Sequence, residues 1–201
     1  MDDRAQLRRR MRTARRALTP HQQRQAAEAL VKRLLRLPAV RRARRVALYL
    51  PNDGEIDPTG LIAPLHARGT RLALPLLAPL GKGRLWFLPW QPGEPLSANR
   101  FGIPEPACSR RRRLPDWHLD LVLLPLVAFD ANGNRLGMGG GFYDRTFARL
   151  ASRRHWRRPR LIGIAHHFQQ TDALPQQPWD VPLDAVVTDR ALHPISRSPH
   201  P

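Results

Sequence analysis

Apolar residues near the start of the chain recur with the period of an α-helix. Between residues 4 and 18 they fall at spacings of four and three positions, which predicts an amphipathic helix. The apolar stripe of this helix consists of Leu7, Met11, Ala14 and Leu18. A second helix is expected over residues 20–36, because Thr19, Pro20 and Gln22 match a capping box with proline at the first helical position.

Farther along, the apolar residues form short runs that have no polar face. The expected strands cover residues 45–50, 71–75, 85–88, 119–124, 161–165 and 185–187, and the expected helices among them cover residues 57–67 and 142–150. Strands that are apolar on both faces and alternate with helices are typical of an α/β protein. We predict one layered domain over residues 1–192, with a mostly parallel central sheet and helices on both faces. It includes the basic helices of residues 4–36 and a long ordered loop over residues 91–118, and a flexible tail over residues 193–201 follows it.

The segment of residues 134–145 holds four glycines within five positions, between an expected strand and an expected helix. Glycine lets the backbone adopt positive φ and approach a ligand closely, and amides at a helix N-terminus point toward an anion. The segment lacks the Lys-Ser/Thr of a Walker A loop and does not fit G-x-G-x-x-G cleanly. It predicts a phosphate cradle, in which Arg135 and Arg145 add positive charge and Asp144 offers a carboxylate to a metal ion.

Three other segments are weaker candidates. The turn of residues 51–57 follows a strand, where ligands bind in open α/β sheets, although Glu55 alone is more typical of a solvated turn carboxylate. A rigid loop of residues 100–106 presents Phe101 as an aromatic platform. Asp180 precedes a strand and has no evident structural task.

The charge of the chain is strongly positive, with 34 basic and 16 acidic side chains and a net charge of +18. Nearly all the basic residues are arginine, which fits a compositional bias and a selected basic surface equally well. The single cysteine, Cys108, excludes an internal disulfide and fits a reducing compartment. No apolar run reaches the roughly 20 residues of a transmembrane helix. We expect a cytoplasmic protein that does not bind membranes.

Taken together, these segments resemble the 5-formyltetrahydrofolate cyclo-ligase family, whose members are also called 5,10-methenyltetrahydrofolate synthetases. The resemblance covers nearly the whole chain. It is strongest at a strand ending in Pro125, at Phe129-Asp130, and at Asn-Arg-Leu-Gly-x-Gly-x-Gly followed by two aromatic residues and Asp in residues 134–144. It implies an ATP- and Mg²⁺-dependent cyclisation of 5-formyltetrahydrofolate to 5,10-methenyltetrahydrofolate, with release of ADP and phosphate.

The resemblance also implies that ATP, as co-substrate, contacts two segments. In the first expected helix these residues are Arg4, Ala5, Gln6, Leu7 and Arg8. In the glycine-rich segment they are Arg135, Leu136, Gly137, Met138, Gly139, Gly140, Gly141, Phe142 and Tyr143. Phe142 stands where relatives more often have Tyr, and Met138 stands where they have Tyr, Phe or Arg. The residues assigned to catalysis are Arg135, Tyr143 and Arg145.

The same resemblance assigns the folate and metal contacts. Leu50 and Glu55 are implied to contact the folate, with Glu55 accepting hydrogen bonds from the pterin, and Phe101 is implied to stack against it. Asp144 and Asp180 are implied to bind Mg²⁺, as hard oxygen ligands for a hard cation. The expected ligands are ATP and 5-formyltetrahydrofolate, with or without a polyglutamate tail, and the expected state is a monomer.

Two other classes of function stay open at this point. A nucleic-acid-binding protein would explain the charge of +18, although the aromatic residues are not interleaved with the basic ones as in single-strand binders. A phosphate-binding isomerase with a related sheet would need no ATP. On the resemblance we expect no specific nucleic-acid partner.

Overall fold

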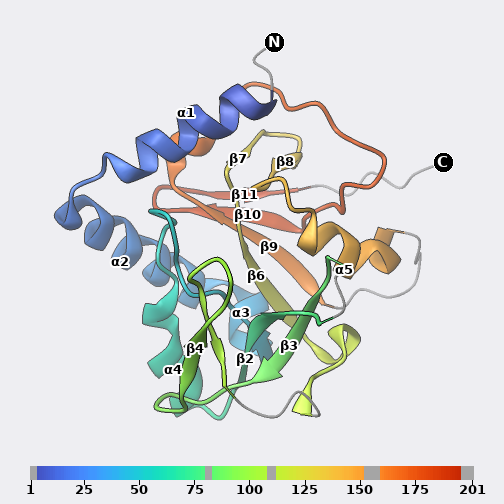
Figure 1. Ribbon diagram of the computed structural model, residues 1–201. Coiled ribbons are helices and arrows are strands. Elements are labelled where there is room, and N and C mark those ends of the chain that lie inside the picture. The colour runs from blue at the N-terminus through green and yellow to red at the C-terminus, as the bar shows by residue number, and fades with distance from the viewer. Residues whose placement is uncertain (1–3, 80–82, 108–111, 152–158, 196–201) are drawn as a thin grey trace.

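The computed structural model describes residues 4–79, 83–107, 112–151 and 159–195. Cys108 and residues 196–201 of the expected tail lie outside the described residues. A seven-stranded sheet, in the order β11-β10-β9-β6-β1-β2-β3, forms the centre of the molecule (Figure 1). Its strands are β1 (Arg45–Ala47), β2 (Arg71–Leu77), β3 (Leu85–Pro89), β6 (Leu121–Pro125), β9 (Arg160–Ala165), β10 (Ala185–Thr188) and β11 (Leu192–Pro194).

The five inner strands of this sheet are parallel, from β10 through β9, β6 and β1 to β2. The strands at the two edges, β3 and β11, pair antiparallel with their neighbours. The prediction of a mostly parallel, layered α/β sheet is therefore confirmed. The antiparallel edges follow from short connections, since parallel neighbours need a long crossover.

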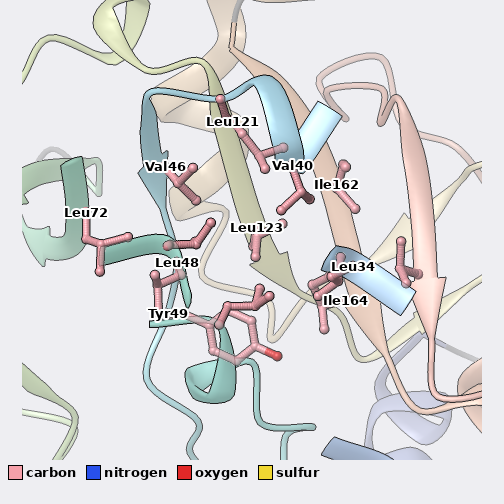
Figure 2. Close-up of a cluster of buried hydrophobic side chains, with 14 of the residues drawn as sticks. Leu34, Val40, Val46, Leu48, Tyr49, Leu72, Leu121, Leu123, Ile162 and Ile164 are labelled. Atoms are coloured by element: carbon pink, nitrogen blue, oxygen red, sulfur yellow. The ribbon is translucent and has the colours of Figure 1, made fainter. Parts of the chain in front are cut away.

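Helices cover both faces of the sheet. On one face lie α2 (Pro20–Arg36), α3 (Pro38–Arg42) and α4 (Ile62–Ala67), with the 3-10 turn η1 (Thr59–Leu61) before α4. They pack Leu34 and Val40 against strand residues that include Leu121 and Leu123 (Figure 2). On the other face lies α5 (Phe142–Ala151), whose Phe147 is fully buried.

Strand β6 shows how one apolar run serves two cores. Leu121 and Leu123 belong to the cluster beneath α2, whereas Val122 and Leu124 belong to the cluster beneath α5. Successive side chains of a strand point to opposite faces, so a central strand must be apolar at every position.

Helix α1 (Arg4–Arg16) packs on a small hairpin of β7 (Ala128–Phe129) and β8 (Arg135–Leu136), which follows β6. The contact is apolar, with Leu7 and Met11 of α1 against residues that include Val127 and Leu136. The hairpin lies beyond the carboxyl end of a parallel strand. As a result α1 runs across that edge of the sheet (Figure 1).

Several predicted boundaries were wrong. The long loop of residues 91–118 contains the hairpin of β4 (Leu96–Ala98) and β5 (Pro104–Pro106) and the turn η3 (Asp116–His118). The tail was expected to begin at residue 193, but β11 continues to Pro194, because its backbone pairs with β10. The first helix ends at Arg16, two residues early. The first strand ends at Ala47, because the chain then leaves the sheet to form the cleft wall described next.

Candidate functional site

A cleft of about 1010 Å³ opens at the carboxyl ends of the parallel strands. Residues of β2, β3 and the end of β6 line it, together with five segments outside these strands: α1, the turn after β1, the β4–β5 hairpin, the glycine-rich segment and residues 177–180. These segments contain every candidate that the sequence singled out from local chemistry. The cleft thus joins the expected phosphate cradle to the expected folate contacts, and it provides one space for two ligands.

The glycine-rich segment forms one wall through its backbone. Residues 137–140 are exposed, and Gly139 and Gly141 have φ of +99° and +58°, which side-chain-bearing residues rarely adopt. The Arg8 Nε–H donates to the Gly137 carbonyl across 2.9 Å. Helix α5 begins directly afterwards, at Phe142. The loop therefore lies at a helix N-terminus beside an arginine, an arrangement suited to binding phosphate.

Two carboxylates and an arginine lie where the glycine-rich segment meets residues 177–181. The largely buried Arg135 donates to the Val181 carbonyl and to Asp144 Oδ1. The Val181 N–H donates to the same Asp144 oxygen across 3.2 Å. Asp180 accepts from the Gln177 N–H across 3.0 Å, and its Oδ2 lies 3.7 Å from Arg4 Nη2. Both carboxylates line the cleft.

This pair of carboxylates fits a magnesium ion of the kind that phosphate substrates bring with them. Within the described residues, no group of three or more His, Cys, Asp or Glu side chains could hold a metal ion. Mg²⁺ is usually held by only one or two carboxylates together with waters and substrate phosphates. Asp144 and Asp180 supply such a set beside a phosphate cradle.

The turn after β1 forms the opposite wall and carries Glu55. The Glu55 carboxylate lines the cleft but is only 12% exposed, and its Oε2 accepts from the Asn52 N–H across 3.1 Å. Burial raises the pKa of Glu55 to about 7, against the lowering effect of the Arg15 charge and the Asn52 hydrogen bond. At neutral pH this carboxyl group is therefore poised between its charged and neutral forms.

Two tyrosines lie near Glu55 and stay protonated. Burial, and then the Glu55 charge, raise the pKa of Tyr49 and of Tyr143 well above the usual value. The Tyr49 hydroxyl donates to the Ile56 carbonyl across 2.5 Å, which fixes the turn. Tyr143 lines the cleft and can act there as a hydrogen-bond donor, not as a base. Leu50, half-buried, also lines this wall.

Phe101 projects from the β4–β5 hairpin over the cleft. Its side chain is 53% exposed, and its ring meets that of Phe142 edge to face at 6.4 Å between centroids. Asn99 accepts from the Phe101 and Ile103 N–H groups, which sets the tight turn between the strands. Phe101 therefore joins the β4–β5 hairpin to the glycine-rich segment.

Helix α1 lines the cleft with arginines spaced four positions apart, namely Arg4, Arg8, Arg12 and Arg16. This spacing places them on one face of the helix. Arg4 lies beside Asp180, and Arg8 donates to Gly137 of the glycine-rich segment, as described above. Arg12 and Arg16 both donate to Asp53, in the turn that carries Glu55. Sequence reasoning missed Arg12, Arg16 and Asp53, although the spacing of four was visible as a signal.

Five predicted site residues are not among those that line the cleft in the described part of the chain. Leu7 and Leu136 are buried together in the apolar contact between α1 and the β7–β8 hairpin. Ala5 and Gln6 are exposed. Arg145 donates to the Gly83 and Gly140 carbonyls, so it stabilises the glycine-rich segment without lining the cleft. The remaining predicted residues lie together around the cleft. The described helices include none that is long and apolar enough to cross a membrane.

Comparisons with known proteins point to one family. A model of the 5-formyltetrahydrofolate cyclo-ligase family matches residues 1–189 of the chain. The 5-formyltetrahydrofolate cyclo-ligase of Escherichia coli K12 is 45% identical over 178 residues, which cover 89% of this chain and 96% of that protein. The corresponding protein of Haemophilus influenzae is 43% identical over 182 residues, covering 90% and 94%. The structure of Aquifex aeolicus 5,10-methenyltetrahydrofolate synthetase superposes with a TM-score of 0.79 at 29% identity, covering 98% of this chain and 96% of the other.

Proposed function

The chain belongs to the 5-formyltetrahydrofolate cyclo-ligase family, and we propose that its cleft carries out the ATP-dependent closure of 5-formyltetrahydrofolate to 5,10-methenyltetrahydrofolate. An amide oxygen is a poor nucleophile and a worse leaving group, so it must be activated before the ring can close. In the first step the formyl oxygen attacks the γ-phosphorus of ATP and ADP leaves, which makes that oxygen part of a good leaving group. The nitrogen at position 10 then attacks the activated carbon, and phosphate departs as the methenyl bridge closes.

The protein's part in this chemistry is to position two ligands and to neutralise charge. On the nucleotide side we assign the triphosphate to the amides of the glycine-rich segment and to Arg4, Arg8 and Arg135. Support comes from the exposed loop backbone at the start of α5 and from the side chains of Arg4, Arg8 and Arg135 in the same wall. Asp144 and Asp180 would hold Mg²⁺, which, when bound, offsets phosphate charge.

On the folate side we assign Glu55 as acceptor for pterin N–H groups, Leu50 as an apolar contact and Phe101 as the stacking surface. All three line the cleft, and the Phe101 ring is exposed. Tyr143 lies between the two ligands by this assignment and donates a hydrogen bond to developing charge. Arg145 supports the loop through the Gly83 and Gly140 carbonyls instead of meeting the substrate.

The observation that carries the proposal is the family match over residues 1–189 together with one cleft that holds both sets of expected contacts. The test mixes the protein with Mg·ATP and 5-formyltetrahydrofolate, and follows the near-ultraviolet absorbance of the methenyl product together with ADP. Absence of both signals, with folded protein, would refute the proposal. The nucleic-acid and isomerase alternatives find no support among the comparisons.

A glutamyl tail on the folate is a finer proposal. Arg12 and Arg16 line the end of the cleft beside the folate turn, where added carboxylates would find positive charge. Affinity for the folate should then rise with tail length at low salt and converge at high salt. Equal affinities for all tail lengths at low salt would remove the idea. A monomeric state, a cytoplasmic location and the lack of a nucleic-acid partner stay predictions.

A further inference from the structure

Arg15 is the most unusual side chain outside the assigned site. It lies on α1 and is 0% exposed, the largest fully buried side chain of the described residues. Arginine is almost never fully buried unless it is paired, since removing its charge from water costs several kcal/mol. A fully buried arginine next to a ligand cleft therefore calls for a role that justifies its cost.

The partners of Arg15 are two carboxylates of the turn after β1. Its Nη2 donates to Asp53 Oδ2 across 3.1 Å, and its Nη1 lies 3.9 Å from Glu55 Oε1. The Nε and Nη1 groups are buried and have no hydrogen-bond partner among the described residues. Arg15 therefore makes a hydrogen bond to Asp53, whereas its interaction with Glu55 is an ion pair just beyond hydrogen-bond length.

The backbone holds this arrangement tightly. Asp53 and Gly54 have φ of +53° and +73°, and a Cβ on Gly54 would come within 3.0 Å of the Arg15 backbone. The Gln23 side chain donates to both the Arg15 and the Gly54 carbonyl across 3.2 Å. The distance between Arg15 and Glu55 is therefore fixed by close packing of α1 on the turn.

We propose that Arg15 is a positioning residue for the folate, which favours the ionised form of the Glu55 carboxyl group and holds it at the cleft as an acceptor for pterin N–H donors. This inference rests on the proposed function. It assigns no contact between Arg15 and the substrate, and its effect passes through Glu55.

The surroundings of Glu55 explain why a cation is needed there. Burial and then the Asp53 charge raise the pKa of Glu55, and the Glu55 charge in turn raises the pKa of Tyr49 and of Tyr143. His166, whose ring nitrogen lies 3.3 Å from the Gly54 carbonyl, has a pKa lowered by burial and supplies little positive charge at neutral pH. The Arg15 charge lowers the pKa of Glu55 and so opposes the effect of burial. This matters because a protonated Glu55 would present an O–H donor where the pterin requires an acceptor.

The experiment measures the pH dependence of kcat/KM for 5-formyltetrahydrofolate in single and double variants. Arg15→Gln should raise KM for the folate about tenfold at pH 7, should leave KM for Mg·ATP within about twofold, and should move the acid limb of the profile to higher pH. Arg15→Lys, which keeps the charge, should recover part of the loss. In a Glu55→Gln background, Arg15→Gln should cost little more.

Asp53→Asn separates this role from a structural one. Removing the Asp53 charge should move the acid limb to lower pH, opposite to Arg15→Gln, because Asp53 raises the pKa of Glu55. If Arg15 only anchored the turn through Asp53, both variants would weaken folate binding alike and neither would shift the limb. That result, or an equal loss in the Glu55→Gln background, would overturn the inference. If Arg15→Gln does not fold, Arg15→Lys takes its place. The inference then requires that the acid limb of the Arg15→Lys profile lie at the same pH as in the wild type.

The proposed function is judged separately, by whether the wild-type protein forms product at all. Cyclisation by the wild type together with an unshifted limb in Arg15→Gln refutes the inference alone.

Discussion

The two walls of the cleft are built on different principles. The wall assigned to the nucleotide, around residues 137–141, offers backbone, since residues 137–140 are exposed and Gly139 and Gly141 have positive φ. The wall assigned to the folate offers a side chain, since Glu55 is 12% exposed and lies 3.9 Å from the buried Arg15. Backbone amides, which every residue except proline supplies, can bind a phosphate. The N–H edge of a pterin instead needs an acceptor, and Glu55 is an acceptor only in its ionised form. The two walls should therefore fail in different ways.

The largest effect is expected for Asp144→Asn. The variant loses a carboxylate that pairs with Arg135 and is assigned to Mg²⁺, so kcat/KM for Mg·ATP should fall by about 100-fold or more. KM for the folate should change little. Initial rates against Mg²⁺ and ATP test this, with Asp172→Asn, an exposed carboxylate outside the cleft, as control. Unchanged kinetics would remove Asp144 from the site.

Next in size is Gly139→Ala. At φ of +99° an added Cβ is strained by about 1–2 kcal/mol, although the nearest atom is no closer than 3.6 Å. We expect KM for ATP to rise about tenfold as the loop changes conformation. Gly69→Ala is the matched control, because it has φ of +77° and open space but lies outside the cleft. It should lower thermal stability and spare KM for ATP. Equal effects of the two variants on KM for ATP would mean that loop conformation does not matter.

The pH dependence of the folate wall should be of similar or smaller size near neutrality. The pKa of Glu55 is raised to about 7, so the carboxylate acceptor is present above that pH and is lost below it. Well below pH 7, we expect kcat/KM for the folate to decrease about tenfold for each unit by which the pH is lowered. Glu55→Gln should lack this limb. At saturating folate, kcat/KM for Mg·ATP should lack it too. A limb that survives in Glu55→Gln belongs to another group.

The smallest effect is expected for Phe101→Ala. Aromatic stacking contributes about 0.5–1.5 kcal/mol beyond burial, so KM for the folate should rise about 3- to 10-fold. Because Phe101 is 53% exposed, thermal stability should hardly move. Phe101→Tyr should keep the affinity, and Trp117→Ala, another exposed aromatic residue outside the cleft, serves as control. Loss of ATP affinity instead would place Phe101 on the other wall.

The same difference decided what the sequence could predict. Strands buried on both faces show themselves as unbroken apolar runs, as β6 does, and glycines at positive φ mark a loop by composition alone. The nucleotide wall was therefore visible in residues 134–145. Glu55, by contrast, looked like a solvated turn carboxylate, because the residues next to it in the sequence do not reveal that distant segments bury it.

The missed residues all depend on long-range contacts. Arg12 and Arg15 meet Asp53 at sequence separations of 41 and 38 residues. An arginine-rich helix predicts a solvated face, and nothing local distinguishes the buried Arg15 from its exposed neighbour Arg16. The β4–β5 hairpin was missed for a related reason. Its proline- and glycine-rich sequence is typical of loops, whereas Glu105 ties it to β2 by accepting from the Leu77 N–H.

The reach of α1 has a consequence for how the protein is made. The helix precedes in synthesis all the partners that its arginines contact, the last of which is Asp180. At about 5–20 residues per second, roughly 9–35 s separate the synthesis of the two residues of that ion pair. The apolar stripe of Leu7 and Met11 has to wait for the β7–β8 hairpin, which covers it and is also made late in synthesis. Ribosome-bound chains arrested before this hairpin should accordingly have a protease-sensitive α1, and protection should appear only in longer chains that contain it.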